Sequence, residues 1–378
     1  MKRVCYTVFY PHMKNVDIIK ESGMMAHYLC QTEKYEVALA AYKGEEFTNI
    51  QLIDSRVSND YIKRRTGYTL PDSLLYLFTR AKKIDVLQLF HLNKMSVIIA
   101  AAYKLLNPQG LVYIKLDTSE RHLQHLLISS GLKGRIREFV LAHIVDLVSA
   151  ETKNVYDKVR QNWGQLANKL IYLPNGIKPV NSESTQKEKI ILTVGRIGSY
   201  EKATDVLLNA LTKCRLKDWT VQMVGPIEPE FNNSIEKWFK ENPHLKEKVI
   251  FTGPVWDRQE LSRYYDKAAV FCLPSRWENF SFALLEAASH GCYLILTPVG
   301  AARELLEITQ YGELVNADDE QRLSQALNDI VDSWKYDHSK DSLIRSTVND
   351  LFNWENIIKS LDEHLSSRLR NKGCHNEN

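Results

Sequence analysis

Short runs of apolar residues alternate along the chain with longer segments of helical periodicity. Strand-like runs stand at 3–10, 35–42, 85–90, 111–116 and 145–149. Between them, apolar residues recur every three or four positions at 22–32, 70–82, 94–106 and 134–143. Mostly apolar strands separated by helices predict a parallel sheet that is covered on both faces.

The same alternation restarts after a polar segment. Residues 169–177 predict a short strand closed by a Pro-Asn-Gly turn, and the polar residues 178–188 predict a linker. Further strands are predicted at 189–194, 219–224, 248–252, 269–273 and 293–297, with helices at 204–214, 231–240, 258–267, 281–289 and 319–333. We therefore expect two doubly wound α/β domains, 1–178 and 179–352, with ligands at the carboxyl ends of the strands, and a final segment, 353–378.

Composition narrows the class of protein. With 378 residues, 44% of them hydrophobic and 25% charged, the chain is neither disordered nor fibrous. The six cysteines form no C-x-x-C pair, so a disulfide framework and a zinc site are not expected. No apolar window is long enough for a transmembrane helix, and the first apolar run is too short for a signal peptide. These observations predict a cytoplasmic protein.

Charge differs between the two halves of the chain. Residues 1–178 carry 25 Lys and Arg against 16 Asp and Glu, whereas residues 179–378 carry 24 against 30. Segment 122–143 is basic and amphipathic, which fits either a helix packed on the domain core or peripheral contact with the inner face of an anionic membrane. No basic stripe with interleaved aromatic residues appears, so nucleic acid is not an expected partner.

Two loops carry the candidate chemistry. The first follows the strand that ends at Val194, where Gly195 lets the backbone approach a ligand and Arg196 and Lys202 suit phosphate oxygens. It matches neither the usual dinucleotide nor the P-loop fingerprint, and two solvated cations are the alternative reading.

The second loop follows the buried strand 269–273. Glu278 precedes a helix whose first amides, at Asn279, Phe280 and Ser281, are suited to phosphate or sugar oxygens. Glu286 lies inside that helix among residues that look buried, so its carboxylate needs a partner or a ligand. Glu278 has the alternative role of complementing the helix dipole.

Together these motifs resemble the retaining GT-B glycosyltransferases, most closely family 4, the glycosyltransferase group 1 domain. The resemblance rests on four short motifs and is strong over roughly 170–360. They are Glu278-x7-Glu286 with Phe280, Val194-Gly-Arg-Ile197 with Lys202 beyond it, Pro174-Asn-Gly-Ile177 and Phe352-Asn-Trp-Glu355.

The resemblance implies a GT-B fold, with two Rossmann-like domains facing across a cleft and a final helix, about 355–368, that crosses back to the first domain. It implies that Arg196 and Lys202 bind the diphosphate of a nucleotide sugar, UDP-sugar first. Glu286 would hold the ribose. The transferred sugar would be held by Glu278 and the 279–281 amides. The base would lie against the loop that contains Gly253 and Val255.

The chain departs from the family pattern at several positions. Glu278-Asn-Phe-Ser281 replaces the usual Glu-Gly-Phe-Gly, and Ala203 follows Lys202 where glycine is usual. The histidine often found in the first domain is not obvious there. Asp117 and then His91 are the candidates for the acceptor-side catalytic residue, and a structural role remains the alternative for each.

The expected reaction is transfer of a hexose or related sugar to a saccharide or lipid-linked acceptor. The proposed chemistry needs no protein nucleophile, and Arg196, Lys202 and Glu278 join the acceptor-side pair as catalytic residues. No cofactor or metal is required if the cations serve the phosphates, and no Asp-x-Asp motif is present. A sugar-nucleotide epimerase of the same fold and a non-catalytic partner subunit are the alternatives.

Overall fold

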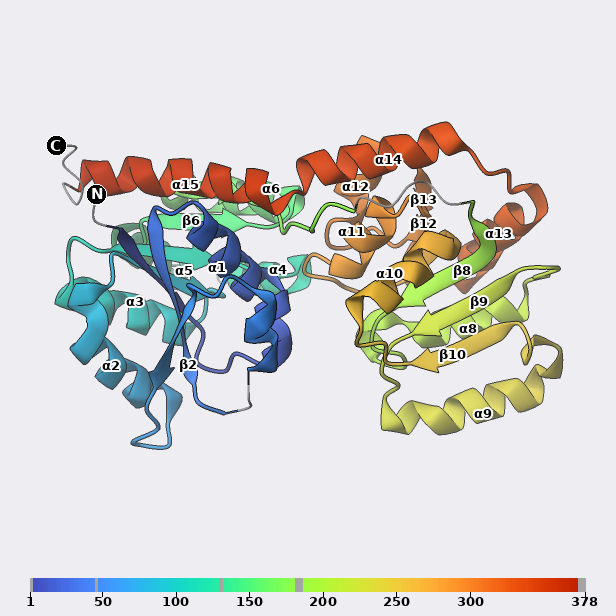
Figure 1. Cartoon of the computed structure of the whole chain (residues 1–378), viewed down its shortest axis with the longest axis horizontal. Helices are drawn as coiled ribbons and strands as arrows, with labels where there is room; N and C mark the ends of the chain where they lie inside the picture. Colours follow the sequence, from blue (N-terminus) through green and yellow to red (C-terminus); the bar gives the residue numbers. More distant parts are fainter. Residues whose placement is uncertain (1–2, 45–46, 129–131, 181–185, 373–378) are drawn as a thin grey trace. The chain divides into compact units, whose positions relative to one another are not determined.

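The computed structural model describes residues 3–44, 47–128, 132–180 and 186–372. It divides into two compact units, each with its own parallel sheet (Figure 1). Unit 1 comprises Met1–Gly176 together with Trp354–Asn378, and unit 2 comprises Ile177–Asn353. The two units are described separately below.

Unit 1 contains a seven-stranded parallel sheet in the order β3-β2-β1-β4-β5-β6-β7. Its strands are β1 (Val4–Phe9), β2 (Tyr35–Tyr42), β3 (Ser58–Ile62), β4 (Val86–Phe90), β5 (Leu111–Lys115), β6 (Leu147–Ala150) and β7 (Leu170–Tyr172). Its helices are α1 (Glu21–Gln31), α2 (Thr69–Arg80), α3 (Lys94–Leu106), α4 (Glu120–Ile128), α5 (Leu132–Ile144), α6 (Lys153–Asn162), α7 (Gly164–Ala167) and α15 (Trp354–Asn371).

The inner strands of unit 1 are continuous apolar runs because both faces of the sheet are covered. Every residue of β4, β5 and β6 is buried. The register pairs Phe90 with Lys115 and Lys115 with Ser149, so the carboxyl ends of these three strands lie side by side. The chain segments that leave β4, β5 and β6 therefore begin at one edge of the sheet.

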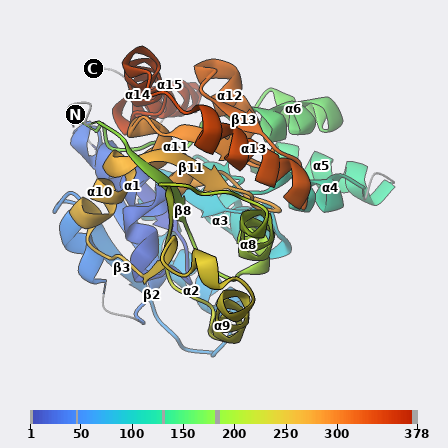
Figure 2. The same ribbon diagram turned by 90° about the vertical axis from the view of Figure 1, so that its right-hand side faces the viewer.

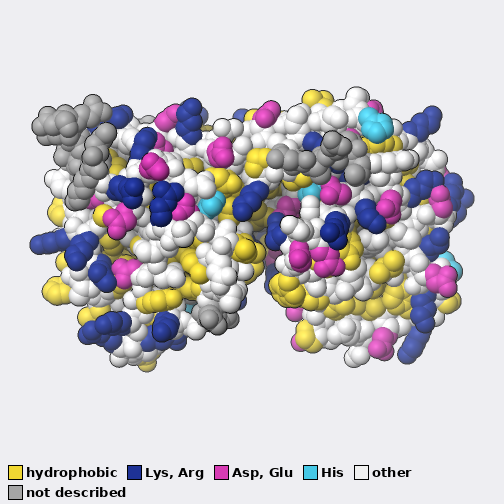
Figure 3. Space-filling view, viewed as in Figure 1, with side chains coloured by type: hydrophobic (Ala, Val, Ile, Leu, Met, Phe, Trp, Pro, Cys, Tyr) yellow, Lys and Arg dark blue, Asp and Glu magenta, His cyan; other side chains and the backbone are white. Residues whose placement is uncertain are grey.

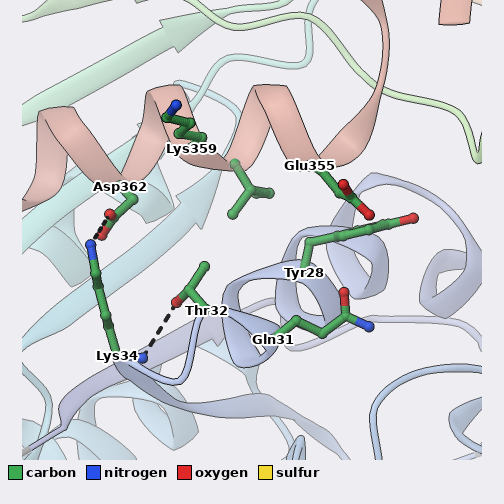
Figure 4. Close-up of a pocket in the computed structure, with 8 residues that line it drawn as sticks. Tyr28, Gln31, Thr32, Lys34, Glu355, Lys359 and Asp362 are labelled. Atoms are coloured by element: carbon green, nitrogen blue, oxygen red, sulfur yellow. Dashed lines mark hydrogen bonds and ion pairs between the residues drawn. The ribbon is translucent and has the colours of Figure 1, made fainter. Parts of the chain in front are cut away.

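Helix α15 packs against α1 within unit 1. The Asp362 carboxylate accepts hydrogen bonds from Lys34 Nζ at 2.5 Å and Tyr35 Oη at 2.7 Å, and the Trp354 ring stacks on Tyr28. A cavity of about 360 Å³ lies between the two helices, next to this ion pair (Figure 4). The last helix is thus tied to α1 by packing and to the start of β2 by charge.

Unit 2 contains a six-stranded parallel sheet in the order β10-β9-β8-β11-β12-β13. Its strands are β8 (Glu188–Val194), β9 (Thr220–Val224), β10 (Val249–Gly253), β11 (Ala268–Leu273), β12 (Tyr293–Leu296) and β13 (Gly312–Leu314). Its helices are α8 (Thr204–Thr212), α9 (Asn232–Glu241), α10 (Arg258–Lys267), α11 (Phe282–Ser289), α12 (Ala302–Thr309), α13 (Glu320–Ser333) and α14 (His338–Leu351).

Alternation along the strands of unit 2 builds two cores, one on each face of the sheet. Along β8, Ile191 joins one core, whereas Ile190 and Leu192 join the other. The first core contains residues of α8, α9 and α13, and α8 and α13 lie side by side in Figure 2. Residues of α10, α11, α12 and α14 build the second core. The prediction of two doubly wound parallel-sheet domains is confirmed.

Several elements were missing from the sequence-based pattern. The strand β3 reads Ser-Asn-Asp-Tyr-Ile and has one buried residue, because it forms an edge of its sheet. The strand β13 has three residues and is an edge strand as well. Helices α4, α6, α7, α12 and α14 were also missed. Edge strands lack the apolar runs on which the prediction relied.

The basic segment 122–143 corresponds to parts of α4 and α5. Residues 129–131 and the side chains of 125–137 lie outside the described residues. Elsewhere on unit 1, Lys and Arg side chains are dispersed among acidic ones on the face shown at the left of Figure 3. Among the described residues, no helix combines the length and apolar character needed to cross a bilayer. Peripheral membrane contact stays a prediction.

Candidate active site

Three glycines lie next to one another at the carboxyl ends of β8, β9 and β10. The Gly195 N–H donates to Val224 O at 3.0 Å, and the Gly225 N–H donates to Gly253 O at 2.9 Å. A Cβ at Gly225 would stand 1.8 Å from Gly195 O, at a φ of +143°. A Cβ at Gly195 would make only ordinary contact with Lys202, at 3.5 Å. The close approach of the β8 and β9 ends therefore depends on Gly225, and the approach of a ligand at Gly195 stays a prediction.

The two predicted cations stand beside this edge. A single 3₁₀ turn, Tyr200–Lys202, follows Ser199, whose Oγ accepts from the Lys202 N–H. Ala203 then adopts a left-handed conformation, with a φ of 51°, before α8 begins. A left-handed residue at this point explains why glycine is usual in the resembled motif.

Lys202 forms an ion pair with Glu278, a contact that the sequence alone did not predict. Lys202 Nζ lies 2.7 and 2.8 Å from the two carboxylate oxygens of Glu278, and Ser275 Oγ donates to the same carboxylate at 2.6 Å. The Glu278 side chain is only 7% exposed. The two predicted loops are thus joined by a largely buried ion pair.

Glu201 extends this pair into a network of four charges. Its carboxylate lies 3.1 Å from Lys202 Nζ and accepts from Arg196 Nη2 at 2.7 Å. The Arg196 side chain is 56% exposed, so its guanidinium is accessible to a ligand. The two cations and two carboxylates give this network a net charge of zero when no ligand is bound. An incoming diphosphate would compete with Glu201 for Arg196.

The loop around Glu278 is shaped by its backbone. Ser281, the residue before α11, has a φ of 76°. Gly300, at a φ of +57°, packs against the loop, and a Cβ there would stand 2.8 Å from Glu278 Cβ. The Phe280 side chain points into the core and packs against Phe352, so its ring does not serve a ligand. Any contribution of Phe280 to a site comes from its backbone.

The Glu286 carboxylate has protein partners. Arg258 Nη2 donates to one carboxylate oxygen, and Tyr265 Oη donates to the other at 3.0 Å. Burial and the neighbouring carboxylate raise the pKa of Tyr265. The expectation that Glu286 needs a partner or a ligand is met by these two residues, so its burial by itself does not call for a ribose. The Glu286 side chain keeps 16% of its surface exposed.

Gly253 is the last residue of β10, and Val255 lies in the segment that follows this strand. Gly253 has a φ of +75°, and a Cβ there would meet open space. Val255 is half-buried against the core, and the neighbouring Trp256 is 78% exposed. The structure therefore places an exposed aromatic ring next to the predicted base-binding segment.

In unit 1, the two acceptor-side candidates lie together. His91 follows β4 and Asp117 follows β5. His91 Nδ1 lies 3.0 Å from Asp117 O and 3.8 Å from Asp117 Oδ2. Both residues have positive φ angles, 58° and 36°, a conformation that stores strain and is found at functional sites. The structure thus unites two residues that the sequence offered as alternatives.

Sequence reasoning missed the residues that hold these groups in place. Arg258 and Tyr265 carry no signal of their own, because Glu286, their partner, is 28 and 21 positions away. Glu201 and Ser275 lie within five positions of their partners, and sequence reasoning passed over them because it looked for ligands of a substrate and not for partners of the charged groups. Gly225 could have been found, since it directly follows a predicted strand as Gly195 does. Among the described residues, no three His, Cys, Asp or Glu side chains are grouped as metal ligands. That the reaction needs no metal stays a prediction.

Comparison with known proteins finds a match to one family model in unit 2 and relatives of part of the chain. Residues 188–333, within unit 2, match the family model of glycosyl transferases group 1. An uncharacterised 41.2 kDa protein in the cps region of Klebsiella pneumoniae is 29% identical over 186 residues, covering 49% of this chain and 48% of that protein. The chain spans about half the length of the curated relatives it matches.

The names of several relatives specify an activity. One of them is the N-acetylgalactosamine-N,N'-diacetylbacillosaminyl-diphospho-undecaprenol 4-alpha-N-acetylgalactosaminyltransferase of Campylobacter jejuni. This protein is 28% identical over 221 residues, which cover 56% of this chain and 58% of the relative.

A solved structure shares the fold over nearly the whole chain. HepE from Anabaena, in complex with UDP, superposes with a TM-score of 0.75 at 15% identity, covering 97% of this chain and all of that one. The structural neighbours include GT-B glycosyltransferases, so the predicted fold class is confirmed. At this level of identity the likeness establishes the fold and not the activity.

Proposed function

We propose that this chain is a retaining glycosyltransferase. It would transfer a hexose or related sugar from a nucleotide sugar to a hydroxyl of a saccharide or lipid-linked acceptor. UDP-sugar is the donor that we favour. The product would belong to cell-surface polysaccharide or glycolipid synthesis. The proposal includes membership of glycosyltransferase family 4. We expect the transfer reaction to take place at the cytoplasmic side of the membrane.

The observation that carries this proposal is the network of Arg196, Lys202 and Glu278. It puts two cations and a largely buried carboxylate beside the strand-end glycines of unit 2. Cations fixed in advance stabilise the charge that develops on a departing diphosphate. A carboxylate held by Lys202 and Ser275 is oriented to accept hydrogen bonds from sugar hydroxyls. These are the two tasks of a donor site.

The comparisons support the same assignment. Unit 2 contains the segment that matches glycosyl transferases group 1. The name of the Campylobacter relative specifies a lipid-linked diphosphate acceptor, and the HepE structure contains UDP. We carry both chemical classes over to this chain as proposals, with UDP as the first nucleotide to test.

The proposed reaction needs few protein groups. Arg196 and Lys202 would stabilise the leaving diphosphate, whose oxygen takes the proton of the incoming hydroxyl. Glu278 would bind the sugar, and Glu286, oriented by Arg258 and Tyr265, the ribose. His91 and Asp117 would bind the acceptor hydroxyl. The two cations supply the positive charge, so we propose catalysis without a metal or a cofactor.

A nucleotide-binding experiment tests the donor site directly. Thermal-shift measurements with UDP, GDP, ADP, CMP and their sugar conjugates would report selective stabilisation that grows with ligand concentration. We expect a shift with UDP and its sugars that is lost in Arg196→Ala. Arg215→Ala is the matched control, since Arg215 is also an exposed arginine of unit 2, with 81% of its side chain accessible.

The outcomes separate the rival functions. No stabilisation by any nucleotide would contradict the donor site, and binding without transfer to any acceptor would favour the non-catalytic partner subunit. A changed sugar nucleotide without acceptor would favour the epimerase.

A further inference from the structure

A buried ion pair lies at the edge of the unit 1 sheet from which His91 and Asp117 emerge. Lys115 is the last residue of β5, and Glu151 comes directly after β6. Lys115 Nζ lies 2.8 Å from Glu151 Oε1, and the two side chains are 0% and 3% exposed. Burying two charges is costly, and apolar side chains of similar volume would hold the strands as well. Stability alone therefore does not explain why this pair is present.

Backbone contacts connect this pair to the acceptor-side candidates. The His91 N–H donates to Lys115 O at 3.0 Å, and His91 Nδ1 lies 3.0 Å from Asp117 O. On the other side, the Leu116 N–H donates to Ser149 O at 3.0 Å. The segment 115–117 is thus held between β6 and His91, and its one buried cation anchors it to Glu151.

Further ionisable groups surround this pair. Glu21 at the start of α1, Tyr113 of β5 and Asp117 act on its charges, and Tyr10 after β1 is influenced by Asp117 and Glu21. Burial and the charges of Asp117 and Glu151 raise the pKa of Glu21 to about 8. Burial, opposed by Lys115, raises the pKa of Glu151 to about 7. Glu21 and Glu151 therefore share one lysine, and the charge of Asp117 acts on both carboxyl groups.

We propose that Lys115 and Glu151 are positioning residues for the acceptor side of the reaction. Their ion pair fixes the backbone of 115–117 and sets the electrostatic environment of Asp117 and His91, the two groups that would meet the acceptor hydroxyl. This inference rests on the proposed function. Neither member of the pair needs to touch the substrate.

The double variant Lys115→Met/Glu151→Leu tests this role without leaving a buried charge. Replacing a buried pair by apolar residues of similar volume is often neutral or stabilising, so we expect a folded protein. We expect kcat/KM for transfer to fall at least about tenfold and the midpoint of its pH profile to move by about one pH unit. The Kd for UDP stays within about twofold, because the donor site belongs to unit 2. Glu151→Gln keeps the shape of the side chain but leaves Lys115 buried without its counter-charge, so we expect this single variant to lose stability that the double variant keeps.

A readout without catalysis separates this inference from the proposed function. We expect the ¹⁵N chemical shifts of the His91 imidazole, recorded at one pH, to change in the double variant. They should stay as in the wild type in the control Arg80→Met/Asp60→Asn, which removes another ion pair of the same unit. Unchanged His91 chemical shifts together with an unchanged pH–rate profile overturn the inference. Absence of transfer by the wild-type protein, with the His91 chemical shifts changed, speaks against the proposed function and leaves the coupling supported.

Discussion

At the scale of single residues, the partners of the charged groups decide what those groups can do. Lys202 was predicted to be a phosphate ligand and Glu278 a sugar ligand, and in the structure each is the other's partner. Similarly, Glu286 is held by Arg258 and Tyr265. A charge that is oriented by a partner is ready for a ligand, because little reorganisation remains to be made when the ligand binds.

The mutual dependence of Lys202 and Glu278 gives a prediction for stability and activity. Lys202→Ala leaves the Glu278 carboxylate buried without its cation, so we expect the free energy of unfolding to fall by about 3 kcal/mol. Lys202→Ala/Glu278→Gln should recover most of this loss in urea unfolding. Transfer should stay reduced by about 10²- to 10³-fold in both variants.

Lys237→Ala is the control for this cycle, since Lys237 is an exposed lysine of α9 in the same unit. We expect a change within about 0.5 kcal/mol in that variant. Wild-type stability in Lys202→Ala would contradict the importance of the ion pair. Wild-type turnover in either Lys202 variant would contradict the catalytic role of Lys202.

At the scale of elements, the ends of neighbouring strands build both candidate sites. In unit 2, the glycines after β8, β9 and β10 follow one another along the sheet edge. In unit 1, the segments after β4, β5 and β6 bring together His91, Asp117 and Glu151. Parallel strands deliver their carboxyl ends to the same edge, so residues far apart in sequence become neighbours there.

Gly225 should be the most sensitive of these strand-end glycines. Gly225→Ala would bring a Cβ to 1.8 Å from Gly195 O and force the two strand ends apart. We expect a loss of about 3 kcal/mol or more in the free energy of unfolding, and weaker nucleotide binding.

Gly253→Ala isolates the contribution of the backbone angle alone. Gly253 also has a positive φ, but a Cβ there meets open space. We expect Gly253→Ala to cost about 1–2 kcal/mol. Equal melting temperatures for the two variants would show that the contact between the β8 and β9 ends does not matter.

At the scale of the whole molecule, the basic first half of the chain contains acids whose charged form is disfavoured by burial. Unit 1 holds Glu21 and Glu151, and burial raises the pKa of each carboxyl above its ordinary value. The basic excess of residues 1–178 does not neutralise this cluster, because many of its Lys and Arg side chains are dispersed over the surface (Figure 3). Net charge per domain is therefore a poor guide to the electrostatics of a buried edge.

The raised pKa of Glu21 predicts how stability depends on pH. The folded protein keeps the Glu21 proton up to a pH of about 8, whereas the unfolded chain releases it near the ordinary glutamate value. The folded state thus binds more protons in between, so this contribution to stability is lost as the pH rises from about 5 to about 8. Urea unfolding at several pH values should show this decline.

Glu21→Gln removes the titrating carboxyl and should flatten that dependence. Glu33→Gln, at an exposed residue of the same unit, should leave the slope as it is in the wild type. A slope in Glu21→Gln equal to that of the wild type would contradict the protonated state of Glu21 in the folded protein.

The sequence by itself determined the two-domain parallel architecture, because buried strands and amphipathic helices each have a characteristic pattern of apolar residues. It also pointed to the two loops that we propose as the donor site, since glycines and charges at strand ends are local signals. Edge strands such as β3 were not predicted, because strands that are exposed to solvent lack a run of apolar residues. Only the tertiary structure decided that Lys202 pairs with Glu278, that His91 meets Asp117, and that Lys115 and Glu151 lie buried beside them. These contacts join residues 26 to 76 positions apart, and such distances are set by the order and register of strands, which no local pattern records.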